Sequence, residues 1–317
     1  MICCCVRWNQ RLCSRALRRL GIVLGLAVLG FVLYRLHAQW QSLELSWSRL
    51  HWPAIGLSLV LLAAAQALFA FSWHRLLSDA GESGELRGDV ARWCVSLAGK
   101  YFPGKVWQAV ARFGLYHGAE RGKKVAPAFV RETLLSLSAA MAIVAAHGWL
   151  DVGATGRLEW VFSMGSLALV LLSLPGVARA AAGPIQRWMP GRVVIPEGGV
   201  AALVEVWSIQ LAGYLVLGLG CFYLARGVGI TQAGITTPVV AGLCFAGLAG
   251  IAAFFVPAGI GVREAALVWY LAPVIGPAPA ALLAVAARVW ISVGEASLVA
   301  AGMFVLHQSG KSEVKTP

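Results

Sequence analysis

Cationic and amide side chains follow a Pro-Gly break in the stretch from Ser96 to Arg112, SLAGKYFPGKVWQAVAR. Lys105, Gln108 and Arg112 are spaced i, i+3 and i+7, so they share one face of a helix that begins after the break. A lysine in the first turn meets the positive end of the helix dipole, which indicates a compensating anion. Free backbone N–H groups together with Lys and Arg suit a phosphate. The alternative is that these side chains reach an anionic membrane surface and hold no particular ligand.

A second broken stretch, FFVPAGIGVRE, runs from Phe254 to Glu264. Gly259 and Gly261 permit tight turns and expose backbone amides. Arg263 then faces a ligand or pairs with a nearby acid, and Glu264 suits the positive end of the helix that follows. The alternative is a plain turn with a surface ion pair.

Five charged residues lie inside otherwise apolar segments: Arg131, Glu132, Glu205, Arg288 and Glu295. Charges at membrane depth are costly and usually face the bundle interior or a cavity. Arg288, Ser292 and Glu295 are spaced i, i+4 and i+7 and form one polar stripe. Each charge could carry protons, pair with an opposite charge or contact a cationic headgroup, and pairing is the commonest of these roles. Three uncharged polar residues share the setting: Gln66, Gln210 and Tyr214.

The composition is typical of a chain that lies in a lipid membrane. Of 317 residues, 59% are hydrophobic and 13% charged, whereas a soluble domain carries about 25% charged residues. The net charge of +12 fits basic cytoplasmic loops and anionic headgroups better than nucleic acid, which we do not expect as a partner. The sequence lacks H-E-x-x-H, G-x-S-x-G and P-loop patterns. We therefore expect no enzyme activity, no cofactor and no metal.

The elements that must position these residues are helices. The apolar runs predict an all-α, polytopic integral membrane protein of about seven to eight transmembrane helices, including two re-entrant or broken helices. An amphipathic helix lying in the interface is the alternative for the first broken stretch. The paired interruptions also suggest an inverted repeat. The expected spans are residues 20–34, 52–73, 125–150, 160–177, 199–225, 237–255 and 280–306, with a short helix at 265–271 and a cytoplasmic loop at 75–92.

One transmembrane domain, residues 20–306, is expected between a basic N-terminal tail, residues 1–19, and a C-terminal tail, residues 307–317. The N-terminal tail carries five arginines and no acid, which predicts a cytoplasmic N-terminus. The helix count leaves the side of the C-terminus open. The expected location is a bacterial inner (plasma) membrane, and homo-oligomerisation stays open.

The two broken stretches resemble the paired signatures of the lysylphosphatidylglycerol synthase/flippase transmembrane-domain family. The first signature, G-K-Y-[IL]-P-G-[KR]-[VI]-W, is matched by Gly99, Lys100, Tyr101, Pro103, Gly104, Lys105 and Trp107. The second, P-[GA]-G-[IL]-G-x-[RK]-E, is matched by Pro257, Gly259, Gly261, Arg263 and Glu264. Phe102 stands in place of the usual aliphatic residue, and Ala258 in place of a frequent glycine.

The resemblance implies a flippase that moves an anionic or modified phospholipid, or a glycolipid, between leaflets. Members that also synthesise the lipid carry an additional acyltransferase-like domain, which we do not expect here. The implied headgroup site comprises the matched residues with Gln108 and Arg112. Two alternatives remain: a proton-coupled transporter of a small solute that uses Glu132, Glu205 or Glu295, and a non-transporting partner of a separately encoded lipid- or glycan-modifying enzyme.

Overall fold

The computed structural model describes residues 50–82, 84–101, 106–116, 119–150, 157–180, 199–253 and 256–313. Helices joined by short connections make up these ranges, and they contain no strand. The prediction of an all-α fold is confirmed to that extent. The basic tail at 1–19, the expected first span at 20–34, and Pro103, Gly104 and Lys105 lie outside the described residues.

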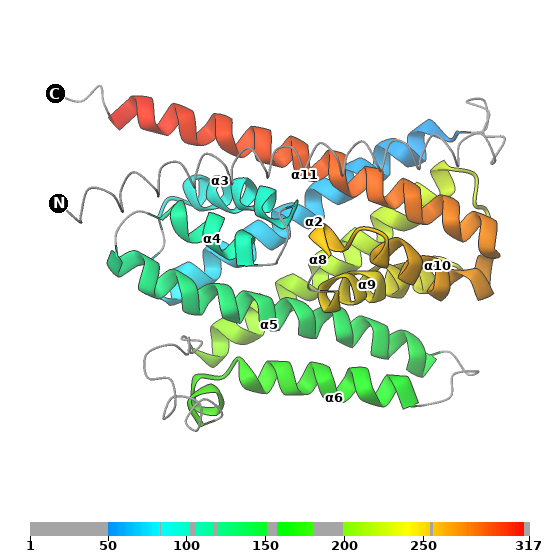
Figure 1. The fold of residues 1–317 in the computed structure, drawn as a ribbon, viewed down its shortest axis with the longest axis horizontal. Helices are drawn as coiled ribbons and strands as arrows, with labels where there is room; N and C mark the ends of the chain where they lie inside the picture. The colour runs from blue at the N-terminus through cyan, green and yellow to red at the C-terminus, as the bar shows by residue number, and fades with distance from the viewer. Residues whose placement is uncertain are drawn as a thin grey trace, which may run out of the picture.

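Four long helices form the frame and run along the length of the bundle (Figure 1). They are α2 (Trp52–Asp79), α5 (Ala119–Leu150), α8 (Val200–Gly227) and α11 (Pro277–Glu313). Each of the four contains a stretch long and apolar enough to cross a membrane. The helix α6 (Arg157–Leu172) is apolar but shorter. The described residues thus contain four candidate spans, so the expected count of seven to eight is not confirmed.

Two pairs of short helices lie among the long ones. The first pair consists of α3 (Leu86–Ser96) and α4 (Val106–Gly114), and α3 continues into the short helix η2 (Leu97–Tyr101). The second pair consists of α9 (Thr236–Ala252) and α10 (Val262–Ile275), with the short helix η3 (Pro257–Gly259) between them. In Figure 1 the first pair occupies the left half of the bundle and the second the right half. The tips η2 and η3 contact each other, and η2 also contacts α11, so the two breaks meet inside the bundle.

Proline and glycine set several helix boundaries. Pro53 stands in the first turn of α2, where its missing N–H costs nothing. Gly276, at φ +86°, ends α10, and Pro277 begins α11 directly after it. The sequence predicted that Pro273 would end a short helix at 265–271, but α10 continues through Pro273 to Ile275. Likewise α11 continues to Glu313, into the expected C-terminal tail.

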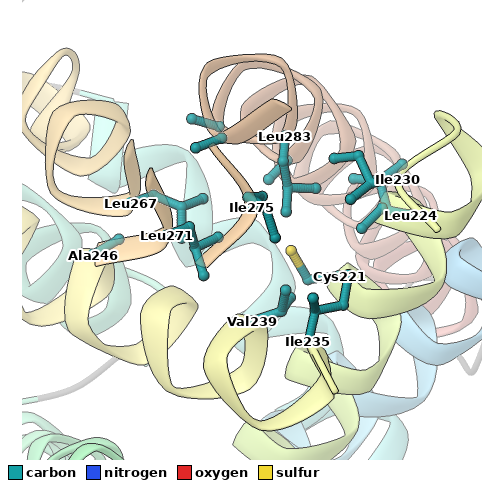
Figure 2. Packing of buried hydrophobic residues seen from close by; sticks show 14 of the residues in the cluster. Cys221, Leu224, Ile230, Ile235, Val239, Ala246, Leu267, Leu271, Ile275 and Leu283 are labelled. Carbon is teal, nitrogen blue, oxygen red and sulfur yellow. The ribbon is translucent and has the colours of Figure 1, made fainter. Parts of the chain in front are cut away.

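Apolar side chains fill the space between the second pair of short helices and the frame. Cys221 and Leu224 of α8, Val239 of α9, Leu271 of α10 and Leu283 of α11 pack in one buried cluster (Figure 2). A second cluster joins α2, α3, α5 and α8 around Trp73. Many large apolar side chains on the outward faces stay exposed, among them Val161 and Val204. Such a surface is consistent with a membrane protein.

The close approach of η2 and α4 requires a residue without a side chain at position 99. A Cβ at Gly99 would lie 2.6 Å from Cα of Gln108 and 2.7 Å from the carbonyl oxygen of Trp107. Both are backbone atoms and cannot rotate away. Gly99→Ala should therefore lower the free energy of unfolding by about 1–3 kcal/mol, the usual cost of overpacking, and this would be measured by thermal unfolding of purified protein in detergent.

Gly56→Ala is the matched control for Gly99→Ala. A Cβ at Gly56, within α2, would meet no atom within 4 Å. Alanine is the better helix former, so the unfolding temperature of this variant should stay the same or rise slightly. An equal loss of stability in the Gly99→Ala and Gly56→Ala variants would contradict the close packing at position 99.

Candidate functional site

A cavity of about 360 Å³ lies where the two breaks meet. Lys100 and Tyr101 reach it from η2, and Arg263 and Glu264 reach it from the start of α10. Arg288 and Glu295 of α11 and Glu132 of α5 complete its charged lining, and Gln108 of α4 contributes an amide. The cavity therefore joins residues of both broken stretches with the polar stripe of the last long helix, although they are far apart in the sequence.

Glu295 of α11 binds the first break through two hydrogen bonds. The Lys100 Nζ donates to Glu295 Oε1 at 3.1 Å, and the Tyr101 hydroxyl donates to Glu295 Oε2 at 2.9 Å. The Glu295 side chain is almost fully buried, so losing these two donors would leave a charge unpaired in an apolar setting. The Lys-Tyr pair of the first signature thus holds a carboxylate of this same chain.

Glu264 and Arg288 fasten the second break in a similar way. The backbone N–H of Gly261 donates to Glu264 Oε2 at 2.6 Å, which caps the start of α10. Arg288 Nε lies 3.5 Å from Glu264 Oε1. The same guanidinium donates to the carbonyl oxygen of Ala258 at 3.2 Å. Ala258 has φ +51°, a left-handed backbone that is uncommon for residues other than glycine, and the contact with Arg288 helps to hold it there.

Arg263 is in a different position from the other cations of the cavity. Its side chain passes over two glycines, since a Cβ at Gly259 would lie 3.1 Å from the Arg263 Cγ and Nε, and one at Gly250 would overlap them. Its Nε is buried without a hydrogen-bond partner among the described residues, as is the Nε of Arg288. No carboxylate among the described residues lies within ion-pair distance of its guanidinium. Arg263 therefore lines the cavity without a counter-ion from the described part of the chain.

Arg112, which was predicted to form the headgroup site with Gln108, does not line the cavity. Its side chain is 1% exposed. It forms an ion pair with Glu132, donates to the Ser96 hydroxyl at 3.1 Å, and stacks over the Trp73 ring at 4.4 Å. Helical spacing grouped it with Gln108, but α4 packs against α3 and α5 through Arg112. Arg112 therefore joins helices to one another.

The remaining predicted residues fall in four places. Arg131 is fully buried and pairs with Asp79 at 2.8 Å, away from the cavity. Glu205 pairs with Arg75 at 2.7 Å, and both side chains are about 40% exposed. Trp107 is half-exposed and lies outside the cavity lining. The backbone positions of the second signature form the break itself: Pro257, Gly259 and Gly261.

Five uncharged polar residues line the cavity but were not assigned to the site from the sequence: Gln66, Thr133, Ser136, Gln210 and Tyr214. The Ser136 and Tyr214 hydroxyls lie 2.9 Å apart, and Gln210 Nε2 donates to the Ser72 hydroxyl at 2.7 Å. Two features of the sequence point to them. Gln66, Gln210 and Tyr214 stand alone in apolar helices, and Ser136 follows Glu132 by one helical turn.

The described residues define an all-helical protein with four helices that could span a membrane and a charged cavity between two helix breaks. No protein-family profile matches the chain, and a comparison with curated proteins finds no relative. Function must therefore be argued from the cavity.

Proposed function

We propose that the protein is a flippase-like transporter rather than an enzyme, and that it moves a phospholipid or modified lipid between membrane leaflets. The observation that carries the proposal is Arg263, a cation that forms no ion pair with any described residue, in a cavity formed by both broken stretches. A charge buried in an apolar bundle is costly unless something pairs with it. The phosphate of a lipid headgroup is an anion that the membrane itself presents, and it matches the guanidinium geometry.

We further propose that the two pairs of short helices are re-entrant. The helices α3, α4 and α10 have 11, 9 and 14 residues, whereas a helix needs about 20 to span a bilayer. In Figure 1 each pair turns back toward the end of the bundle from which it starts, and the two pairs start from opposite ends. That arrangement supports an inverted relation between the halves. It also disfavours an interfacial helix for the first broken stretch, because η2 packs against η3 and α11, and α4 packs against α3 and α5.

The distribution of basic residues supports a cytoplasmic side at the left end of the bundle in Figure 1, where α5 and α8 begin and α11 ends. Short cytoplasmic loops carry an excess of Lys and Arg. Among the described residues, the helix ends on this side carry Arg121, Lys123, Lys124, Arg179 and Lys311. The described helix ends on the opposite side carry Arg157 and Arg226. The end of α11 would then share the cytoplasmic side with the end of α2 and the start of α3.

Single cysteines on a background without the seven native ones test this orientation. Glu85, at the start of α3, and Ala233, between α8 and α9, are both exposed and lie at opposite ends of the bundle. Ala233→Cys should react with a membrane-impermeant maleimide in intact bacterial cells, and Glu85→Cys should react only after the cells are opened. The reverse pattern would contradict the proposed orientation.

The alternative of a proton-coupled transporter for a small solute has less support. Of its three candidate proton carriers, Glu132 is held by Arg112 and Trp93, and Glu295 by Lys100 and Tyr101. Glu205 lies off the cavity in a half-exposed ion pair. No observation favours a non-transporting partner of another enzyme.

Transport of labelled phospholipids in proteoliposomes tests the proposal. Vesicles that contain the purified protein should exchange fluorescent phosphatidylglycerol between leaflets faster than protein-free vesicles of the same composition. Quenching of the outer-leaflet label by an impermeant reductant gives the rate. If no headgroup class moves faster than in protein-free vesicles, the proposal is wrong.

A further inference from the structure

The charges around the cavity pair off with one exception. The lining contains three cations, Lys100, Arg263 and Arg288, and three carboxylates, Glu132, Glu264 and Glu295. Lys100 pairs with Glu295 and Arg288 with Glu264. Glu132 forms an ion pair with Arg112, which does not line the cavity. Four cations therefore face three carboxylates among the described residues, and Arg263 is the one left over.

None of the three carboxylates has an oxygen left without a donor or a cation. The oxygens of Glu295 receive Lys100 and Tyr101, and those of Glu132 receive Arg112 and Trp93. The oxygens of Glu264 face the Gly261 N–H and Arg288. A ligand with an ammonium group would therefore have to compete with an existing intramolecular partner for every carboxylate that it meets.

The polar groups that remain are neutral. Gln66, Gln108, Thr133, Ser136, Gln210 and Tyr214 offer amides and hydroxyls to the cavity. The Gln210 Oε1 is buried and accepts no hydrogen bond from the part of the chain that the structure describes. Amides and hydroxyls can both donate and accept, which suits the hydroxyls of a small polyol. The volume of about 360 Å³ lies at the lower end of ligand-site volumes, so it fits a headgroup and not a whole lipid.

From this charge balance we infer that the cavity selects a phosphodiester with a single negative charge and an uncharged, hydroxyl-bearing terminal group. The inference rests on the proposed function and specifies its substrate class. One oxyanion compensates the one cavity guanidinium that stays unpaired among the described residues. A phosphomonoester carries up to two negative charges near pH 7. One of these negative charges would exceed what the unpaired guanidinium compensates. A headgroup with an added ammonium offers the same phosphate to Arg263, but its ammonium finds no free carboxylate among the described residues.

Binding of defined lipids to the full-length protein tests the selection. Native mass spectrometry of protein in detergent is carried out with phosphatidylglycerol, phosphatidylethanolamine and phosphatidic acid of identical acyl chains. Phosphatidylglycerol should bind about tenfold or more tightly than either competitor, the scale of one charge-assisted hydrogen bond. Arg263→Gln should remove this preference. Equal binding of the three lipids to the wild type would overturn the inference.

Lys100→Gln provides a second variant with a different expected outcome. It leaves Glu295 without its cation, so phosphatidylethanolamine should gain affinity relative to phosphatidylglycerol. If the ratio of the affinities for phosphatidylethanolamine and phosphatidylglycerol is the same in this variant as in the wild type, the charge balance of the cavity is contradicted.

Deacylated phosphatidylglycerol, a soluble phosphodiester, separates the inference from the proposed function. If it binds as tightly as the intact lipid, the headgroup chemistry stands but the substrate is a soluble solute, and the flippase proposal fails. If the protein transports all three lipids at the same rate, the flippase proposal stands and the inferred selectivity fails.

Discussion

Replacing Arg112 with leucine should lower the free energy of unfolding by about 3–5 kcal/mol, the cost of leaving a buried charge unpaired. Arg112 is 1% exposed and is the ion-pair partner of Glu132. It also stacks on Trp73 at 4.4 Å and lies 5.2 Å from the Phe129 ring centroid. Because these contacts join α4 to α2 and α5, the substitution should loosen the first pair of short helices. Thermal unfolding in detergent would measure the loss.

Arg75→Leu is the matched control for Arg112→Leu, because Arg75 also pairs with a glutamate but both side chains are about 40% exposed. Exposed pairs contribute at most about 1 kcal/mol. The double variant with Arg112→Leu and Glu132→Leu should recover part of the lost stability, since it also removes the carboxylate left unpaired. If the Arg112 and Arg75 variants unfold at the same temperature, Arg112 does not have the structural role assigned here.

Arg263→Gln should slow lipid exchange in proteoliposomes by roughly 10- to 100-fold while leaving the unfolding temperature close to that of the wild type. The substitution removes the unpaired cation of the cavity and breaks no ion pair among the described residues. Hydrogen bonds to a charged group contribute about 1.5–3 kcal/mol, which corresponds to that range of rates. The exchange rate of Arg263→Lys should fall between those of Arg263→Gln and the wild type, because lysine keeps the charge but loses the bidentate geometry.

Arg226→Gln controls for the general loss of a positive charge. Arg226 lies at the end of α8, outside the cavity lining, and stacks over Phe222 at 5.0 Å. This variant should transport lipid at the wild-type rate. Wild-type transport by Arg263→Gln, with the same amount of folded protein in the vesicles, would show that Arg263 does not bind the substrate.

Several features of the cavity could be predicted because they depend on local sequence. Glycine and proline mark both breaks, and a break inside an apolar chain is usually stabilised inside protein. Charges in apolar helices had to point inward, which brought Arg288 and Glu295 into consideration. The structure gathers these residues with Lys100 and Arg263 around one cavity.

The choice of partners could not be predicted in the same way. Arg131 pairs with Asp79, and Arg112 with Glu132, across helices whose packing angle and depth no local pattern specifies. Composition was also misleading for residues 75–92, which were expected to form a cytoplasmic loop. They include the end of α2 and part of α3, and Asp89 is fully buried there with hydrogen bonds to His74 and Tyr116. Burial of a polar residue depends on its neighbours in space.

The central claim is that the cavity between the two breaks holds a lipid headgroup. An electron cryomicroscopy map of the protein in phosphatidylglycerol nanodiscs tests it most directly. The account predicts headgroup density inside the cavity, with the phosphate within hydrogen-bond distance of the Arg263 guanidinium. A well-resolved map with an empty or water-filled cavity, and with headgroups only at the membrane surfaces, would contradict it.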